Sequence, residues 1–540
     1  MAIALLALVA ASAAAGDPPT SARLISSSGG GQLPAPTSLL VEYLGEGSSN
    51  GDVVVGTRRP RFSFLPHPEH AHPGNGVAMV SYHIVVVLAG KGGKPAWDSG
   101  MVNATAAVGI KCGVELASLT SYSWTASWTA DGIIGPSPPA SASFTIGPAA
   151  ADWALGSEWV GSGQNEFRIT VATPDAAAAR IFVASPGGAV LRSATGAHLG
   201  SDPTGLSAWV DFRLSVPYMG FPLVQSTSGD ADATEPAEVT VTRVVTLTIG
   251  NGFWSGSYKL GSSFWGIPSG EAAVAQILIM GGTISKIEGR RGAVMANDPW
   301  EGCLLDCGRP DEAGWGAAKP VPAAGGWRPT GAPMALQVPY ARASGRMTQR
   351  LPIKALEVTV LSPGADGSKR WSYKFDRNIV GHAAVTLDAV STTGAGNLTL
   401  RHCELLNTTL GESKAFCLAL AHLPDQPDIY MLPAGINQVT STQQLASAAI
   451  TTSAAGKQQL TPTFTWHGFQ YVIVEATTGV SFAAKLDSLE PRWTVPELAE
   501  TAAITFAGEG AETLEQIQEI VVASQISNLA GFGPTDCPSN

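Results

Sequence analysis

Residues 511–529 read AETLEQIQEIVVASQISNL, and they form the one convincingly helical stretch outside the N-terminal segment. Leu514, Ile517 and Val521 recur at short steps among Glu and Gln, which predicts an amphipathic helix with one apolar face. Elsewhere, short runs containing Val, Thr and Trp alternate with turns drawn from 61 Gly and 37 Pro residues. The sequence therefore predicts a mainly β protein with a helix near its C-terminus.

The chain is large and weakly charged. Its 540 residues are enough for several domains with buried cores. Charged residues make up 14% of the chain, and 43 acidic against 32 basic side chains leave a net charge of −11. No cluster of Lys and Arg forms a stripe that would follow a phosphate backbone, so neither nucleic acid nor an anionic membrane is expected as a partner.

The N-terminal segment is typical of export. Residues 1–15 are a run of apolar and small residues that is too short to span a bilayer and ends in an Ala-rich cleavage-like site. The run has no Lys or Arg at its start, and the alternative is an alanine-rich leader. We predict a signal peptide over 1–15, a Gly/Ser/Pro linker over 16–37, and a secreted, extracellular protein.

Cysteines and glycosylation sequons fit an oxidising route of synthesis. Cys403 and Cys417 are close enough in sequence for a local disulfide, as are Cys303 and Cys307. No CxxC pair or group of histidines accompanies them, so no metal site is predicted. Three sequons begin at Asn103, Asn397 and Asn407.

The segment 38–148 has the pattern of a small, fibronectin-III-like β-sandwich. Strands are predicted at Val80–Leu88, Tyr122–Trp128 and Ser141–Ile146, with a turn at Trp97–Gly100. On the second of these strands three aromatic residues share one face, because side chains alternate with a period of two. We expect these residues, Tyr122, Trp124 and Trp128, to form core rather than a ligand platform.

Short motifs along the chain resemble those of the bacterial-type α-L-rhamnosidase family. The C-terminal helix is followed by an SN dipeptide and a PTDCP turn at residues 534–538, as in that family. The N-terminal sandwich contributes PRFS at 60–63, WDSG at 97–100, YSW at 122–124 and FTIG at 144–147. The sequence IGNGFW at 249–254 is similar to a turn of the family's second sandwich.

The third region carries the sharpest resemblance. Its matching stretches are WSYKFDRNIVG at 371–381, LTLRHCELL at 398–406 and TFTWHGFQYVIV at 463–474. Each is an alternating strand, and Asp376 with Asn378 is expected to cap a turn. The resemblance implies a larger sandwich at 150–350, another at 351–500, and the start of an α-helical barrel at 510–540.

Five residues are candidates for substrate binding. Trp254 and Trp265 are flanked by Gly and are suited to stacking on a sugar ring, or alternatively to closing the turn end of the sandwich. Glu404 and His467 are polar residues in apolar strands, and their alternative role is structural hydrogen bonding. Asp536 matches the Asp that helps to hold the sugar in the family. No metal ligand and no cofactor are predicted.

The resemblance implies an inverting glycoside hydrolase that removes terminal α-L-rhamnose, a reaction that requires two carboxyl groups. In the family the acid is a Glu shortly after the PTDCP turn, and the base lies farther along the barrel. Neither has a counterpart before Asn540, so we predict no catalytic residue in this chain and expect it to be the non-catalytic N-terminal portion of such an enzyme.

Two other functional interpretations stay open at this point. The chain is alternatively a secreted carbohydrate-binding or adhesion protein without hydrolase activity, which uses the sandwiches alone. A cell-surface scaffold with no sugar ligand is the third interpretation.

Overall fold

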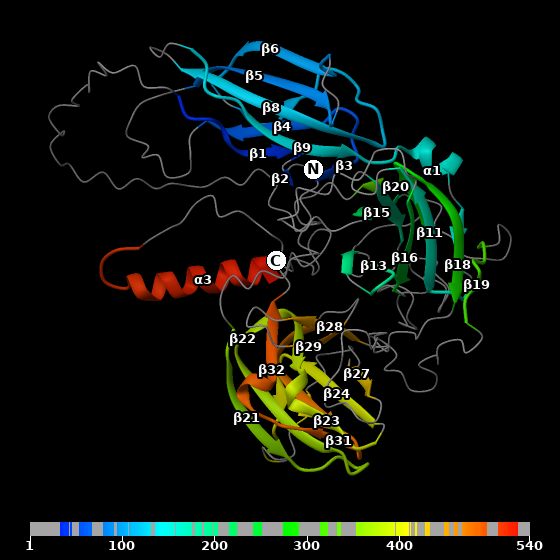
Figure 1. Ribbon diagram of the computed structural model, residues 1–540. Coiled ribbons are helices and arrows are strands. Elements are labelled where there is room, and N and C mark those ends of the chain that lie inside the picture. Colours follow the sequence, from blue (N-terminus) through cyan, green and yellow to red (C-terminus); the bar gives the residue numbers. More distant parts are fainter. Residues whose placement is uncertain are drawn as a thin grey trace.

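The computed structural model is mainly β, with several sheets and a helix near the C-terminus, as the sequence predicted (Figure 1). Its strands fall into three groups along the chain, coloured from blue through green to orange in Figure 1. The structure describes residues 33–42, 44–45, 53–66, 79–90, 94–105, 107–130, 135–156, 158–161, 163–174, 179–185, 188–196, 198–202, 215–223, 241–250, 274–290, 314–321, 332–335, 353–394, 396–409, 411, 416–417, 427–432, 448–452, 458–462, 467–493 and 506–527. The predicted signal peptide lies outside these ranges.

The first group of strands forms two sheets. One has the order β2-β1-β4-β7, and the other has the order β3-β9-β8-β5-β6. The strands are β1 (Thr37–Val41), β2 (Leu44–Gly45), β3 (Val53–Val55), β4 (Arg61–Leu65), β5 (Met79–Leu88), β6 (Trp97–Asn103), β7 (Ile110–Lys111), β8 (Thr120–Ala130) and β9 (Ala140–Ile146). The predicted strands at Val80–Leu88, Tyr122–Trp128 and Ser141–Ile146 are thus confirmed as β5, β8 and β9.

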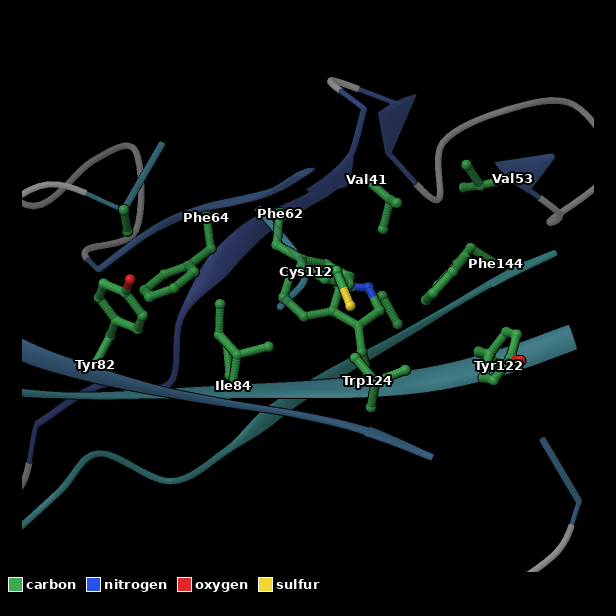
Figure 2. Close-up of a cluster of buried hydrophobic side chains, with 14 of the residues drawn as sticks. Val41, Val53, Phe62, Phe64, Tyr82, Ile84, Cys112, Tyr122, Trp124 and Phe144 are labelled. Carbon is green, nitrogen blue, oxygen red and sulfur yellow. The ribbon is translucent and has the colours of Figure 1, made fainter. Parts of the chain in front are cut away.

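Aromatic side chains fill the space between these two sheets (Figure 2). Trp124 is fully buried, with its ring 4.7 Å from that of Phe62, while Tyr122 stacks on Phe144 at 5.6 Å. Trp128 is also buried and donates its indole N–H to the carbonyl of Pro34 at 2.9 Å. The prediction that these aromatics form core is confirmed, because alternation along β8 turns every second side chain inward.

Two expectations for this region were wrong. Leu33, within the predicted linker, is buried in the first core, so the end of that segment is part of the sandwich. The expected turn at Trp97–Gly100 is a strand, β6, with a register shift against β5 between His83 and Val85. Gly100 has φ of 61° and donates its N–H to Asp98 at 2.8 Å, so the residues form a bulge that keeps the strand paired.

The second group also forms two sheets, with the orders β10-β17-β12-β15-β20 and β14-β13-β16-β11-β18-β19. The strands are β10 (Trp159–Val160), β11 (Glu166–Thr173), β12 (Arg180–Ala184), β13 (Ala189–Ser193), β14 (His198–Asp202), β15 (Ser215–Pro222), β16 (Val241–Ile249), β17 (Ala275–Met280), β18 (Thr283–Arg290), β19 (Gly316–Ala317) and β20 (Ala332–Ala335). Alternation along β11 directs Phe167, Ile169 and Val171 into the core between the sheets.

A short helix, α1 (Ala150–Gly156), joins the first two groups and was not predicted. Seven residues are too few to establish a helical period, and tertiary contacts stabilise such a helix instead. Trp153 of α1 is buried in a cluster with Phe182 and Tyr218 of the second group, and Val54 of the first group packs against the same cluster. Tyr218 donates its hydroxyl to Pro148 at 3.2 Å, so the two groups share a small core.

The third group is dominated by one large sheet with the order β27-β24-β30-β22-β29-β28, and β21 and β32 also pair with β22. Two small ladders, β23-β31 and β25-β26, complete it. The elements are β21 (Ala355–Leu361), β22 (Lys369–Thr386), η3 (Leu387–Ala389), β23 (Val390–Thr392), β24 (Gly396–Cys403), β25 (Leu406–Asn407), β26 (Phe416–Cys417), β27 (Pro427–Leu432), β28 (Ala448–Thr452), β29 (Gln458–Pro462), β30 (His467–Ala476), β31 (Val480–Phe482), η5 (Leu486–Ser488) and β32 (Leu489–Trp493).

The expected turn at Asp376 and Asn378 is an irregularity inside a continuous strand. Strand β22 runs through both residues, and its register with β30 shifts between Lys374 and Ile379. The long strand therefore pairs with β30 over its first part and with β32 farther on. The irregularity interrupts the ladder without ending the strand, and polar residues such as Asp376 and Asn378 are also typical of turns, so the sequence pattern does not distinguish the two.

The C-terminal helix, α3 (Ala511–Ser527), is confirmed. Val522 and Ala523 pack against the core of the third group, and Arg377 of β22 forms an ion pair with Glu519 at 3.1 Å. None of the described helices is long and apolar enough to cross a membrane. Cys403 is disulfide-bonded, Cys112 is a buried free thiol, and Cys303 and Cys307 lie outside the described residues.

Candidate functional site

The structure describes two of the five predicted substrate-binding residues. Trp254, Trp265 and Asp536 lie outside the described residues, and their roles stay predictions. Glu404 follows the end of β24 and is partly exposed, whereas His467 is the first residue of β30 and is buried. These two residues come from different sequence motifs, so their positions relative to one another are a tertiary result.

A glycine brings the two motifs together. Gly468 follows His467 on β30, and a Cβ atom at this position would lie 2.9 Å from Oε1 of Glu404. The carboxylate therefore lies directly against the backbone of β30, where a side chain would displace it. Glu404 and Gly468 belong to separate sequence motifs, so this contact means that the two motifs lie next to each other in the fold.

His467, which precedes Gly468, stacks on a second buried histidine, His402. The rings of His402 and His467 stack with centroids 4.2 Å apart, and Phe469 packs edge-on against His402 at 4.8 Å. The backbone N–H of Ala383 donates to Nε2 of His402 at 3.3 Å. A ring nitrogen that accepts a hydrogen bond carries no proton, so the neutral ring of His402 is protonated on Nδ1.

A third buried histidine belongs to the same cluster. His382 lies on β22 next to Gly381, which is the ladder partner of His467, and His382 itself faces Arg492 of β32. Burial, with smaller contributions from Arg492 and His467, lowers the pKa of His382 to about 3. Burial likewise holds the pKa of His402 well below its usual value. Both rings are therefore neutral near pH 7.

The chemistry of this histidine cluster (His382, His402 and His467) is that of a structural network. The neutral, buried rings of His382 and His402 are suited to packing and hydrogen bonding rather than to proton transfer near pH 7. Among the described residues, no group of three or more His, Cys, Asp or Glu side chains is arranged to hold a metal ion. The burial of His467 agrees with the alternative of structural hydrogen bonding that the sequence left open for it.

Sequence reasoning identified His467 but missed His382 and His402. His382 lies between Gly381 and Ala383, a signal similar to that of His467, whereas His402 directly follows Arg401 and is not an isolated polar residue. Nothing in their sequence spacing indicates that they meet, because strands that are distant in sequence supply them.

The described residues form several β-sheets followed by a helix, and comparison with solved structures finds a similar fold in α-L-rhamnosidases. The enzyme from Dictyoglumus thermophilum matches with a TM-score of 0.58 and 16% identity, over 92% of this chain and 52% of that one. The enzyme from Aspergillus terreus matches with a TM-score of 0.57 and 13% identity, over the same shares of the two chains. The Streptomyces avermitilis enzyme, solved with L-rhamnose, matches with a TM-score of 0.55 and 16% identity, over 92% of this chain and 61% of that one.

These similarities establish a rhamnosidase-like fold. The chain spans about half the length of the first two enzymes and 61% of the third. The sequence matches no protein-family model, and it matches no curated protein sequence.

Proposed function

We propose that this chain forms the β-sandwich part of a secreted, α-L-rhamnosidase-like glycoside hydrolase that acts on rhamnose-containing glycans. One observation carries the proposal: the fold agrees with three α-L-rhamnosidases over 92% of this chain. The motifs of the third region support it, because the Glu404 and His467 motifs meet at Gly468. The reaction class is removal of terminal α-L-rhamnose with inversion at the anomeric carbon.

In this proposal the sandwiches bind and position the glycan, and another part of the enzyme supplies the catalytic carboxyl groups. Trp254, Trp265 and Asp536 contact the sugar, because indole faces stack on sugar C–H bonds and carboxylates accept hydrogen bonds from hydroxyls. Glu404 and His467 have a structural role within the third sandwich in this proposal. The proposed units are 38–148, 150–350 and 351–500, with 510–540 leading into a helical barrel.

The proposal makes a prediction about activity. An inverting hydrolase loses its chemistry without its acid and its base, and in this proposal neither of these carboxyl groups belongs to residues 17–540. Purified residues 17–540 are therefore expected to release no rhamnose from an aryl α-L-rhamnoside, while binding immobilised rhamnose-terminated glycan. Hydrolysis is followed by release of the aryl alcohol, with heat-denatured protein as the control.

The two measurements separate the candidate functions. Turnover above the heat-denatured control would mean that the catalytic carboxyl groups lie within this chain. Binding without turnover in a protein whose natural length is 540 residues would favour the carbohydrate-binding or adhesion function. Either absence of rhamnose binding or binding that is unchanged in Trp254→Ala would contradict the assigned sugar contacts.

A further inference from the structure

A charged and aromatic surface lies on the outer face of the second group, away from the histidine cluster. Along β11, Phe167 and Ile169 point into the core, so Glu166 and Arg168 point to the opposite, outer face of the sheet. The register places Arg168 opposite Glu288 of β18, and Glu166 opposite Arg290. The four side chains therefore form a square of alternating charge on adjacent strands.

The ion pairs of this square are close. Arg168 donates from Nε to Oε2 of Glu288 at 2.9 Å, and Lys286 Nζ lies 2.8 Å from Oε1 of the same carboxylate. Arg290 donates from Nε to Oε2 of Glu166 at 2.7 Å, and its Nη2 lies 2.6 Å from the same oxygen. Lys286 and Arg168 hold the pKa of Glu288 below its usual value, so this carboxylate is ionised and engaged on both oxygens.

The exposed part of the square is cationic. The side chains of Glu288 and Glu166 are only 14% and 16% exposed, whereas those of Arg168, Arg290 and Lys286 are 36%, 27% and 61% exposed. The basic side chains are therefore more exposed than the two carboxylates that they pair with. On a chain with a net charge of −11, this surface is a local concentration of positive charge.

An indole completes the surface. Trp315 precedes β19, which pairs with β18, and the guanidinium carbons of Arg168 and Arg290 lie 4.8 Å and 4.5 Å from its ring centre. Stacking on one indole holds both guanidinium groups in place. Trp315 is partly exposed, and the following residues Gly316 and Ala317 are exposed.

We propose that this guanidinium–indole surface, formed by Arg168, Arg290 and Trp315 with Lys286 at its edge, binds an acidic glycan that carries uronate carboxylates. Guanidinium groups bind carboxylates through paired N–H donors, and an indole accepts the apolar side of a sugar ring. A neutral glycan has no charged group to pair with these basic side chains, and the surface is too short to follow a nucleic-acid backbone. The inference rests on the proposed function and narrows its substrate class to acidic polysaccharides.

The test measures binding of the full chain to polygalacturonate, with neutral dextran and dextran sulfate as comparison polymers. We expect polygalacturonate to bind, dextran not to bind, and Trp315→Ala and Arg168→Gln each to weaken polygalacturonate binding by about tenfold. Trp315→Phe, which keeps an aromatic ring, is expected to retain most of the affinity. Arg401→Gln is the matched control, because Arg401 also pairs with a glutamate, Glu475 at 2.9 Å, on a different sheet. Thermal unfolding of each variant verifies its fold.

Distinct results would overturn the proposal. Equal loss in Arg401→Gln and Arg168→Gln would mean that overall charge drives binding, as would equal binding of dextran sulfate that is insensitive to Trp315→Ala. No binding of polygalacturonate by the folded wild-type chain would reject the proposal outright. Binding to a neutral rhamnose-terminated glycan is measured in parallel, so failure of the acidic-glycan surface is distinguishable from failure of the proposed rhamnoside function.

Discussion

At the scale of single residues, the histidine cluster makes the third group of strands sensitive to acid. His382 is buried, and no described residue hydrogen-bonds its Nε2 atom. Its pKa is about 3 in the folded protein and near 6.5 in an unfolded chain. Between these values the unfolded chain takes up a proton that the folded protein excludes. The contribution of neutral His382 to the free energy of unfolding is therefore fully present above pH 6.5 and is lost as the pH falls toward 3.

Acidification from pH 7 to pH 5 is expected to lower the free energy of unfolding of this unit by about 2 kcal/mol through His382 alone. His402 acts in the same direction, since burial also lowers its pKa. Guanidinium titrations at pH 7, 6 and 5 measure the effect. His382→Gln is expected to reduce the dependence on pH. Equal acid slopes in the wild type and His382→Gln would contradict the assignment.

At the scale of elements, α3 is attached to the third group by one side only. Val522 and Ala523 pack on the core, and the Arg377–Glu519 ion pair lies near them in sequence. The apolar residues of the predicted stripe stay exposed within the described structure, by 46% for Leu514, 52% for Ile517 and 46% for Val521, and Ile520 beside them is 68% exposed. Helix stability in proteins comes mostly from packing, so the few contacts at Val522 and Ala523 have a large effect on whether α3 stays attached.

Val522→Gln is expected to increase the rate of protease cleavage within 511–527 several-fold, because it places a polar group against the core. Ile520→Gln is the matched control and is expected to leave cleavage unchanged, since that side chain is exposed. Limited proteolysis with mass spectrometry measures both. If the two variants were cleaved at the same rate, the packing of Val522 would not be what holds α3.

At the scale of the whole molecule, the first two groups of strands are coupled through α1. Trp153 is buried between elements of the second group, and Val54 of β3 packs against the same cluster. The side-chain amide of Gln276 donates to the carbonyl of Trp153 at 3.2 Å, which anchors the helix on β17. This shared core makes us expect the two groups to unfold together.

Trp153→Ala is expected to cost about 3–5 kcal/mol, because it opens a cavity in the shared core, and to separate the two groups into distinct unfolding transitions. Differential scanning calorimetry detects the separation. Trp97→Ala is the control, since Trp97 is partly exposed on β6 and lies outside this cluster. A single transition in Trp153→Ala, shifted no more than in Trp97→Ala, would argue against coupling through α1.

The prediction of secretion also belongs to the whole chain. If residues 1–15 are a signal peptide, the mature N-terminus lies near Gly16 or Asp17. In a eukaryotic host at least one of the three sequons is then expected to carry a glycan, and Asn103 and Asn397 are exposed. Mass spectrometry of the purified protein measures both properties, and an intact Met1 on cytosolic protein would refute the prediction.

Local patterns in the sequence determined the β class, the inward-facing aromatics of β8 and the position of α3. Alternation and helical periodicity are properties of neighbouring residues, so a single stretch carries the information. Local patterns failed at Trp97–Gly100 and at Asp376–Asn378, because an irregularity inside a strand and a turn use similar residues and differ in whether the strand continues. They also failed for α1, which depends on the burial of Trp153.

Only the tertiary structure decided which polar residues meet. It placed Glu404 against Gly468, stacked His402 on His467, and laid Trp315 against Arg168 and Arg290. Each contact joins strands that are far apart in the sequence, and their register is set by the burial of whole sheet faces rather than by the residues in contact. The sequence by itself therefore indicated the kinds of residue that a site requires, and the pairing of distant strands determined where those residues come together.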